Sequence, residues 1–117
     1  MIIAKHFEFE AAHQLMGEEY GKCNCLHGHT YKLTIGIEGQ VNASGWVMNF
    51  KDLKQIVNEQ VIEKLDHSNL NDILTPSTAE NLVGWIYKQI NPLVLYPNKV
   101  KFIRLYETSD SYAEMRY

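Results

Sequence analysis

The strongest constraint on the fold is a regular alternation of apolar and polar side chains over residues 30–38. The apolar positions are Tyr31, Leu33, Ile35 and Ile37, and the polar positions around them are Thr30, Lys32, Thr34 and Glu38. Because successive side chains of a β-strand point to opposite faces, this alternation predicts a strand with one face on a core and the other face in water.

Two further stretches alternate in the same way. The first has apolar residues at Ile3, Phe7, Phe9 and Ala11 and predicts a strand that ends at His13. The second covers residues 99–107, and we expect residues 111–117 to be its hairpin partner across Thr108-Ser109-Asp110. Residues 14–26 have no period and predict a loop.

Apolar residues at helical spacing fill the middle of the chain. They predict a first helix over 50–64, with Asn49 as its N-cap. We expect a second helix to begin at a capping box of Ser77 and Glu80 and to end at Pro92. The order ββααββ predicts an α+β fold in which two helices cover one face of an antiparallel four-stranded sheet.

The composition indicates one domain and limits its partners. The chain has 117 residues, 45% of them hydrophobic, so a single domain over 1–117 can bury its own core. Its net charge of -3, without a basic block, argues against nucleic acid and anionic membranes as partners. No apolar run approaches the roughly 18 residues of a membrane span, and the charges near the N-terminus leave no signal-peptide core. We therefore expect a cytoplasmic protein.

The residue types that bind metals are concentrated just before the strand over 30–38. Cys23, Cys25, His27 and His29 occupy alternate positions there. In an extended backbone the imidazoles of His27 and His29 point to the same side. If the first two predicted strands pair as a hairpin, their ends bring His13 near His29. Three imidazoles with a fourth position open are typical of a catalytic zinc site.

The same segment allows a second kind of metal site. Cys23, Cys25, His27 and His29 can form a structural Cys₂His₂ zinc site, although the gap between the cysteines is shorter than usual. Such a site would stabilise a noncatalytic module and would leave His13 without a role. In a catalytic site, a thiol beside a dication should have a lowered pKa and can act as a base or nucleophile. The pattern does not choose between Cys23 and Cys25 for that role.

Two other positions carry ionisable groups of interest. Asp66-His67 directly follows the first helix, and a carboxylate beside an imidazole can hold its tautomer or raise its basicity. Glu107 has the strand parity of Ile103 and Leu105, so we expect it on a buried face, where a carboxylate needs a partner. That partner is either a basic side chain of a neighbouring strand or the paired N–H donors of a guanine-like or pterin-like ring.

Taken in order along the chain, these residues resemble the motifs of the 6-pyruvoyltetrahydropterin synthase family. The matching motifs are Phe9-Glu10-Ala11-Ala12-His13, Cys23-x-x-x-His27-Gly-His29, Leu65-Asp66-His67 with Leu70-Asn71-Asp72, Thr78-Ala79-Glu80-Asn81, and Glu107-Thr108. Within this family, the short chain and the three-residue gap before His27 are most similar to bacterial-type 6-carboxytetrahydropterin synthases of queuosine (7-deazaguanine) biosynthesis.

The resemblance implies a zinc-dependent carbon–carbon lyase. Its implied metal ligands are His13, His27 and His29, which bind Zn²⁺. The implied catalytic residues are Cys23, Asp66 and His67 as an acid–base pair, and Glu107, which anchors the pterin ring and is linked to proton relay. Thr78 is implied as a backbone contact to the pterin edge. The implied substrate is 7,8-dihydroneopterin triphosphate, and the carboxy-forming reaction yields 6-carboxytetrahydropterin, acetaldehyde and triphosphate. The role of Cys25 stays open.

The resemblance also implies the tunnelling fold, in which trimers close their sheets into a barrel and stack as dimers of trimers. Active sites then lie between subunits of a homohexamer, and we expect Asp66 and His67 to serve a neighbour's site. Formation of 6-pyruvoyltetrahydropterin and an aldolase-like cleavage are the alternative reactions, and a cysteine at position 23 argues against the second. Two departures from the family pattern, at Asn49-Phe50 and at an extra residue within 76–81, bear on the helix starts and on Thr78.

Overall fold

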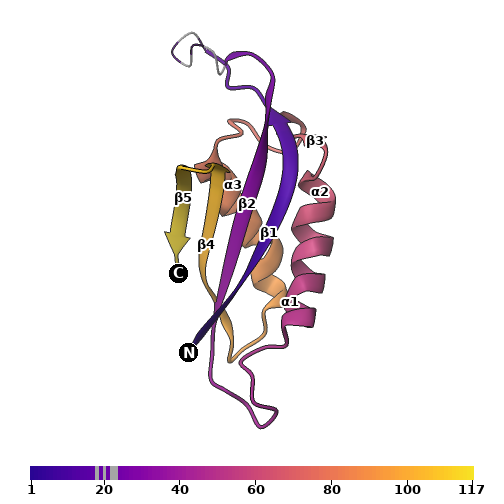
Figure 1. Cartoon of the computed structure of the whole chain (residues 1–117), viewed down its shortest axis with the longest axis vertical. Coiled ribbons are helices and arrows are strands. Elements are labelled where there is room, and N and C mark those ends of the chain that lie inside the picture. The colour runs from indigo at the N-terminus through magenta and orange to yellow at the C-terminus, as the bar shows by residue number, and fades with distance from the viewer. Residues whose placement is uncertain (18, 20, 22–23) are drawn as a thin grey trace.

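The computed structural model describes residues 1–117 except 18, 20, 22 and 23. Its longest feature is the antiparallel pair of β1 (Ile2–His13) and β2 (His27–Glu38), which follows the long axis of the molecule (Figure 1). The pair keeps one register throughout, from Ile2 opposite Glu38 to His13 opposite His27. Both strands were predicted from the alternation of apolar and polar residues, and both are confirmed.

The sheet continues from β2 through β4 (Lys99–Thr108) to β5 (Ser111–Arg116), and its strand order is β3-β1-β2-β4-β5. The predicted fold class and antiparallel arrangement are confirmed, with one strand more than predicted. This strand, β3 (Ser68–Asn69), pairs in parallel with Ala11 and Ala12 of β1. Its two residues are polar and show no alternation, which is why the sequence pattern did not reveal it.

The first predicted helix is confirmed as three consecutive helical segments. These are α1 (Phe50–Val57), a π-helical segment (Asn58–Ile62) and α2 (Glu63–Leu65). Asn49 caps the first segment as predicted, because its side chain accepts a hydrogen bond from the backbone N–H of Lys51 at 2.9 Å.

The second helix, α3 (Ala79–Ile90), is confirmed, but its predicted capping box is wrong. Thr78 is the N-cap, and its hydroxyl oxygen accepts a hydrogen bond from the backbone N–H three residues later at 3.2 Å. Ser77 is completely buried, and its hydroxyl donates to Asn71 instead. A local sequence pattern could not distinguish these neighbouring hydroxyls, because their roles depend on the distant residues that surround them.

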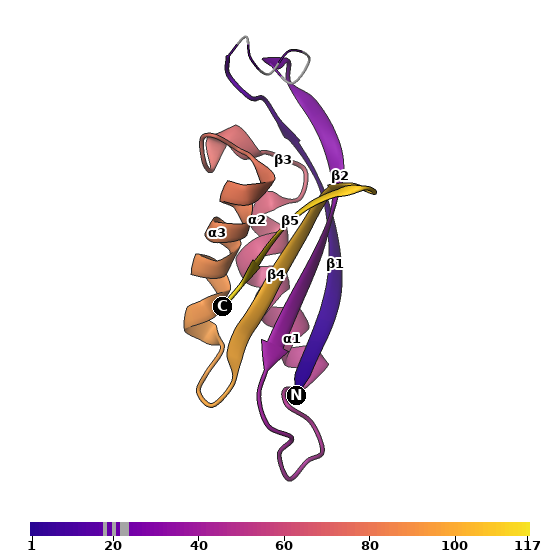
Figure 2. The same cartoon turned by 90° about the vertical axis from the view of Figure 1, so that its left-hand side faces the viewer.

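The helices cover one face of the sheet, and the core lies between the two layers (Figure 2). The completely buried side chains of this core include Phe9, Tyr31, Leu33, Ile35 and Ile37 from the strands and Leu53, Val57, Leu82 and Ile86 from the helices. The predicted inward positions of β2 are therefore confirmed. Among the described residues, no helix has the length and apolar character needed to cross a membrane.

Gly36 of β2 lies directly beneath the ring of Phe102, its partner on β4. A methyl group at position 36 would overlap this ring. We expect Gly36→Ala to lower the free energy of unfolding by about 1–3 kcal/mol, as overpacking does elsewhere. In a Phe102→Ala background the same change should cost almost nothing. Urea unfolding measures both effects, and an equal cost in the two backgrounds would exclude the ring as the cause.

Candidate metal centre

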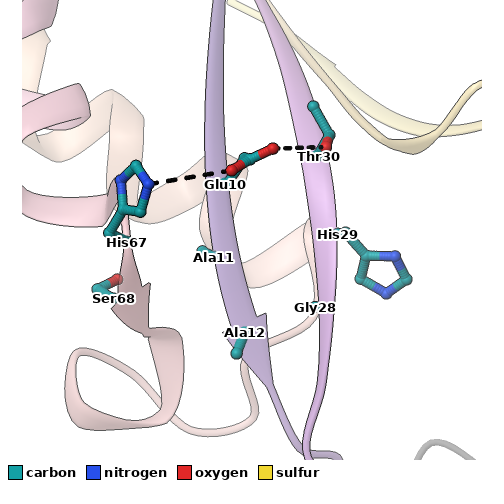
Figure 3. Close-up of a pocket in the computed structure, with 8 residues that line it drawn as sticks. All are labelled: Glu10, Ala11, Ala12, Gly28, His29, Thr30, His67 and Ser68. Carbon is teal, nitrogen blue, oxygen red and sulfur yellow. Dashed lines mark hydrogen bonds and ion pairs between the residues drawn. The ribbon is translucent and has the colours of Figure 1, made fainter.

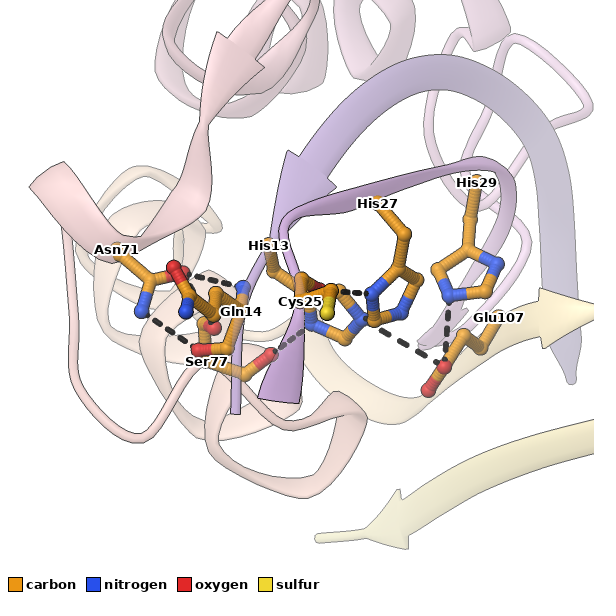
Figure 4. A network of polar contacts seen from close by, with 8 residues as sticks. All are labelled: His13, Gln14, Cys25, His27, His29, Asn71, Ser77 and Glu107. Atoms are coloured by element: carbon orange, nitrogen blue, oxygen red, sulfur yellow. Dashed lines mark hydrogen bonds and ion pairs between the residues drawn. The ribbon is translucent and has the colours of Figure 1, made fainter. Parts of the chain in front are cut away.

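Three histidines from β1 and β2 converge where the two strands meet the loop between them. His13 lies opposite His27, and His29 lies opposite Ala11. All three positions have the parity of the buried core residues, so their rings lie on the helix-covered side of the sheet. Ring centroids are 4.6 Å apart for His13 and His27, 5.1 Å for His13 and His29, and 4.8 Å for His27 and His29. The structure brings together the three imidazoles that the sequence singled out (Figure 4).

Backbone carbonyls fix the tautomers of two of these rings. Nδ1 of His13 lies 2.7 Å from the carbonyl oxygen of Ser77, and Nδ1 of His27 lies 2.7 Å from that of Cys25. A carbonyl only accepts, so each Nδ1 carries the hydrogen and each Nε2 of the neutral ring carries a lone pair. The two Nε2 atoms are 3.0 Å apart. Lone pairs that face each other at this distance repel unless a cation binds both, which is the arrangement expected of metal ligands.

Glu107 adds a carboxylate to the three imidazoles. Its Oε1 atom lies 2.9 Å from Nε2 of His29 and 3.7 Å from Nε2 of His13. Although this distance is short, the buried Nε2 atom of His29 has no hydrogen-bond partner among the described residues. One ligand atom from each of these four side chains lies within 4.8 Å of the others. The donor set of imidazoles and a carboxylate suits zinc and other divalent transition metals.

The surroundings of His29 favour its neutral form. Burial lowers the pKa of His29 most, Glu107 opposes this effect, and His13 and His27 lower the pKa further. A neutral imidazole offers the lone pair that a metal ligand requires, whereas a protonated ring cannot bind a cation. The lowered pKa of His29 and the positions of the three imidazoles therefore both favour metal binding.

Glu107 is half-buried rather than buried, and it lies at a shift in the pairing of β4 with β5. The predicted basic partner on a neighbouring strand is not found among the described residues; the carboxylate instead contacts imidazoles. On its other side it lines a hollow with Ala79 and Glu80 at the start of α3 and Tyr112 and Ala113 of β5. Thr78, the half-buried N-cap of α3, is the residue before Ala79, the first residue of α3 that lines this hollow.

Tyr31 is a site residue that the sequence reasoning treated only as core. Its ring stacks on Phe9 at 5.0 Å and meets the rings of His13 and His29 edge-on at 6.3 Å and 5.7 Å. Burial, followed by the charge of Glu107, raises the pKa of Tyr31, so its hydroxyl stays protonated. Tyr31 follows His29 by two residues and therefore lies on the same face of β2. This spacing could have identified it from the sequence as a neighbour of the histidines.

Asp66 and His67 form the close pair predicted from the sequence. Asp66 Oδ2 lies 3.0 Å from His67 Nδ1, and Asp66 Oδ1 accepts a hydrogen bond from the backbone N–H of Glu10 at 2.9 Å. That backbone hydrogen bond is the main reason why the pKa of Asp66 lies below its usual value. His67 has a φ of 58°, a left-handed conformation uncommon outside glycine, and its N–H donates to Glu10 at 2.6 Å.

This pair does not join the imidazole group within one chain. Figure 3 shows His67 beside Glu10, with the His29 ring pointing to the opposite side of β2. The His67 side chain is 77% exposed, and it borders a shallow hollow over Ala11 and Gly28 that His29 also lines. The contact between Asp66 and His67 is thus formed, and His67 does not belong to the group of possible metal ligands among the described residues.

Of the two cysteines in the loop before β2, the structure describes Cys25. Cys23, the predicted catalytic cysteine, lies outside the described residues. Cys25 is exposed, and its thiol does not belong to the group of possible metal ligands among the described residues. That group contains His13, which the alternative Cys₂His₂ site left without a role. The arrangement therefore favours a site of imidazoles and a carboxylate.

Comparisons with known proteins agree on one family. The family model described as 6-pyruvoyl tetrahydropterin synthase matches residues 2–117. The chain is 40% identical over 116 residues to an Archaeoglobus fulgidus protein provisionally named a 6-carboxy-5,6,7,8-tetrahydropterin synthase, covering 99% of this chain and 96% of that protein. It is 37% identical over 109 residues to the dihydroneopterin monophosphate aldolase of Pyrococcus furiosus, covering 93% and 91%.

A solved structure shows the same fold. The 6-pyruvoyl tetrahydropterin synthase of Caenorhabditis elegans superposes with a TM-score of 0.90 at 25% sequence identity, over 100% of this chain and 95% of that one. The likeness confirms the fold that the motifs implied for the single chain.

Metal binding by variants separates the two metal sites that the sequence allowed. We expect His13→Ala to weaken Co²⁺ binding by more than the roughly 10–100-fold typical of changes behind the ligands, because it removes a ligand itself. Cys25→Ser should bind as tightly as the unchanged chain, since the carbonyl that holds His27 is retained. Titration against a chromophoric chelator measures both affinities. Retention of the metal by His13→Ala together with its loss from Cys25→Ser would establish the Cys₂His₂ site.

Proposed function

Because the chain belongs to the 6-pyruvoyl tetrahydropterin synthase family, we propose that it is a zinc-dependent 6-carboxy-5,6,7,8-tetrahydropterin synthase. In this proposal it converts 7,8-dihydroneopterin triphosphate and one water molecule to 6-carboxytetrahydropterin, acetaldehyde and triphosphate for queuosine biosynthesis, as a carbon–carbon lyase. The name of the 40% identical relative supports the carboxy-forming reaction. The observation that carries the proposal is the pair of Nε2 atoms of His13 and His27, 3.0 Å apart with both Nδ1 atoms bound to carbonyls.

His13, His27 and His29 would hold the zinc ion. Bound there, zinc would act as a Lewis acid that lowers the pKa values of the substrate's side-chain hydroxyls. The chain's own side chains would exclude water, bind the substrate and transfer protons. Tyr31 and Phe9 close the site from the core side and exclude water, because both are almost completely buried.

Glu107 is proposed to bind the pterin ring. Its carboxylate lies between the imidazoles and the hollow at the start of α3, so a ring in that hollow could donate paired N–H groups to it. The backbone of Thr78, next to Ala79 at the edge of the same hollow, would meet the edge of the ring. Together these contacts would point the substrate's side chain toward the histidines.

Proton transfer is proposed to involve Cys23 and His67. Cys23 as a thiolate would take a proton from the substrate, and His67 would pass protons on as the side chain is rearranged and cleaved. Asp66 contacts Nδ1 of His67 and would hold the orientation of its ring during transfer. Because the His67 and His29 rings lie on opposite sides of the paired strands β1 and β2, His67 would serve the metal site of a neighbouring chain.

The sheet edges support a homo-oligomer. Among the described residues, the outer side of β1 pairs with β3 only at Ala11 and Ala12, so most of this side is an open edge there. β5 is the edge on the other side. Open edges this long invite pairing with another chain, and closure of sheets into a ring removes them. A trimer, or a dimer of trimers, is the proposed assembly.

The reaction product distinguishes this function from its alternatives. We expect the zinc-loaded protein, incubated with 7,8-dihydroneopterin triphosphate, to form 6-carboxytetrahydropterin, identified by mass spectrometry of the pterin. The pyruvoyl product would assign the chain to biopterin-type synthesis, and an aldolase-like cleavage of the pterin side chain would match the name of the Pyrococcus relative. A chain that binds zinc but converts neither this substrate nor its monophosphate would be a noncatalytic module.

Mixed oligomers test whether sites are shared. Cys23→Ala and His67→Ala chains should each be inactive, since each lacks one proton-transfer group. When the two are unfolded and refolded together, random pairing should restore about a quarter of the activity, because a site needs one intact group from each neighbour. Mass measurement of the intact oligomers confirms mixing. Mixed oligomers without activity would place both groups in one chain's site.

A further inference from the structure

The orientation of His13 depends on a chain of hydrogen bonds that starts outside the metal site. The carbonyl that accepts from its Nδ1 belongs to Ser77, in the connection between a 3₁₀ turn (Leu70–Asp72) and α3. Connections without regular structure are usually the most variable part of a fold. Something must therefore hold this carbonyl in place if His13 is to keep one orientation.

Asn71 is the side chain that does so, and it acts on His13 from two directions (Figure 4). Its Oδ1 atom accepts hydrogen bonds from the hydroxyl of Ser77 at 3.0 Å and from the backbone N–H of Gln14 at 2.8 Å. Its Nδ2 atom donates to the carbonyl oxygen of Gln14 at 2.7 Å. Gln14 directly follows His13, so one amide fixes both the backbone beside His13 and the residue that holds its ring.

We propose that Asn71 is a positioning residue of the metal site, which orients His13 through Ser77 and Gln14. The inference rests on the proposed function to the extent that His13 is a metal ligand. His13 and Ser77 are completely buried, so water cannot easily replace the hydrogen bond between them, and the hydrogen bonds of Asn71 are part-buried. With Asn71 in place, the Nε2 lone pair of His13 is directed at the position it shares with His27.

The chemistry of the contacts requires an amide. Two of them need an acceptor at Oδ1, and the third needs a donor at Nδ2. An aspartate at this position would keep the shape but place a carboxylate oxygen against the carbonyl oxygen of Gln14, with no hydrogen between them. Asn71→Asp is therefore a matched variant that removes only the hydrogen bond to the Gln14 carbonyl. Ser77→Ala removes only the hydrogen bond between Ser77 and Asn71.

The test is Co²⁺ affinity, measured by competition with a chromophoric chelator and independent of turnover. We expect Asn71→Ala and Asn71→Asp to weaken binding by about 10–100-fold, the usual effect of groups that orient a ligand, and Ser77→Ala to weaken it less. Asn98→Ala is the control, because this asparagine braces another loop by donating to the Val47 carbonyl at 3.0 Å. It should change affinity by less than about twofold, whatever it does to thermal stability.

A double-mutant cycle separates orientation of His13 from a general loss of structure. In a His13→Ala background, Asn71→Asp should have no further effect on Co²⁺ affinity, since no imidazole remains to be oriented. An equal loss in both backgrounds, or unchanged affinity of the Asn71 variants, would overturn this inference alone. An unchanged chain that binds no Co²⁺ would overturn the proposed metal site as well.

Discussion

The register between β1 and β2 is the constraint on which the site depends. It places His13 opposite His27 and keeps His29 on the same face. A slip of one residue would turn every side chain of one strand to the other face and separate the imidazoles. The register is fixed by the core rather than by the histidines, because Phe9 and Tyr31 are cross-strand partners that stack at 5.0 Å and are almost completely buried. The hydrophobic pattern that folds the sheet therefore also assembles the candidate metal centre.

Electrostatics at this end of the sheet are arranged for a cation. Carbonyl acceptors hold the hydrogens of His13 and His27 on Nδ1, so the lone pairs on Nε2 face one another. Burial lowers the pKa of His29, and Glu107 supplies a negative charge beside it. Each feature has a cost for a chain without a metal, since lone pairs repel and buried polar atoms lose water. A bound divalent ion would offset these costs together.

Periodicity and residue type predicted the site residues that lie on strands. They did not predict the roles of residues in the irregular connections. His13, His27 and His29 were found because strand alternation and hairpin pairing fix where their side chains point. The short strand β3, the N-cap at Thr78 and the link from Asn71 to Ser77 were missed. Their polar side chains follow no period, and their partners are set by how the connection before α3 folds back on β1. The role of Cys23 stays a prediction from family resemblance.

X-ray absorption at the zinc edge of the metal-loaded protein tests the central claim most directly, because it identifies the ligand atoms themselves. A site of His13, His27 and His29 predicts imidazole scattering with nitrogen or oxygen ligands only, at about 2.0–2.1 Å. Sulfur ligands at about 2.3 Å would contradict it and would assign the metal to the cysteines of the loop.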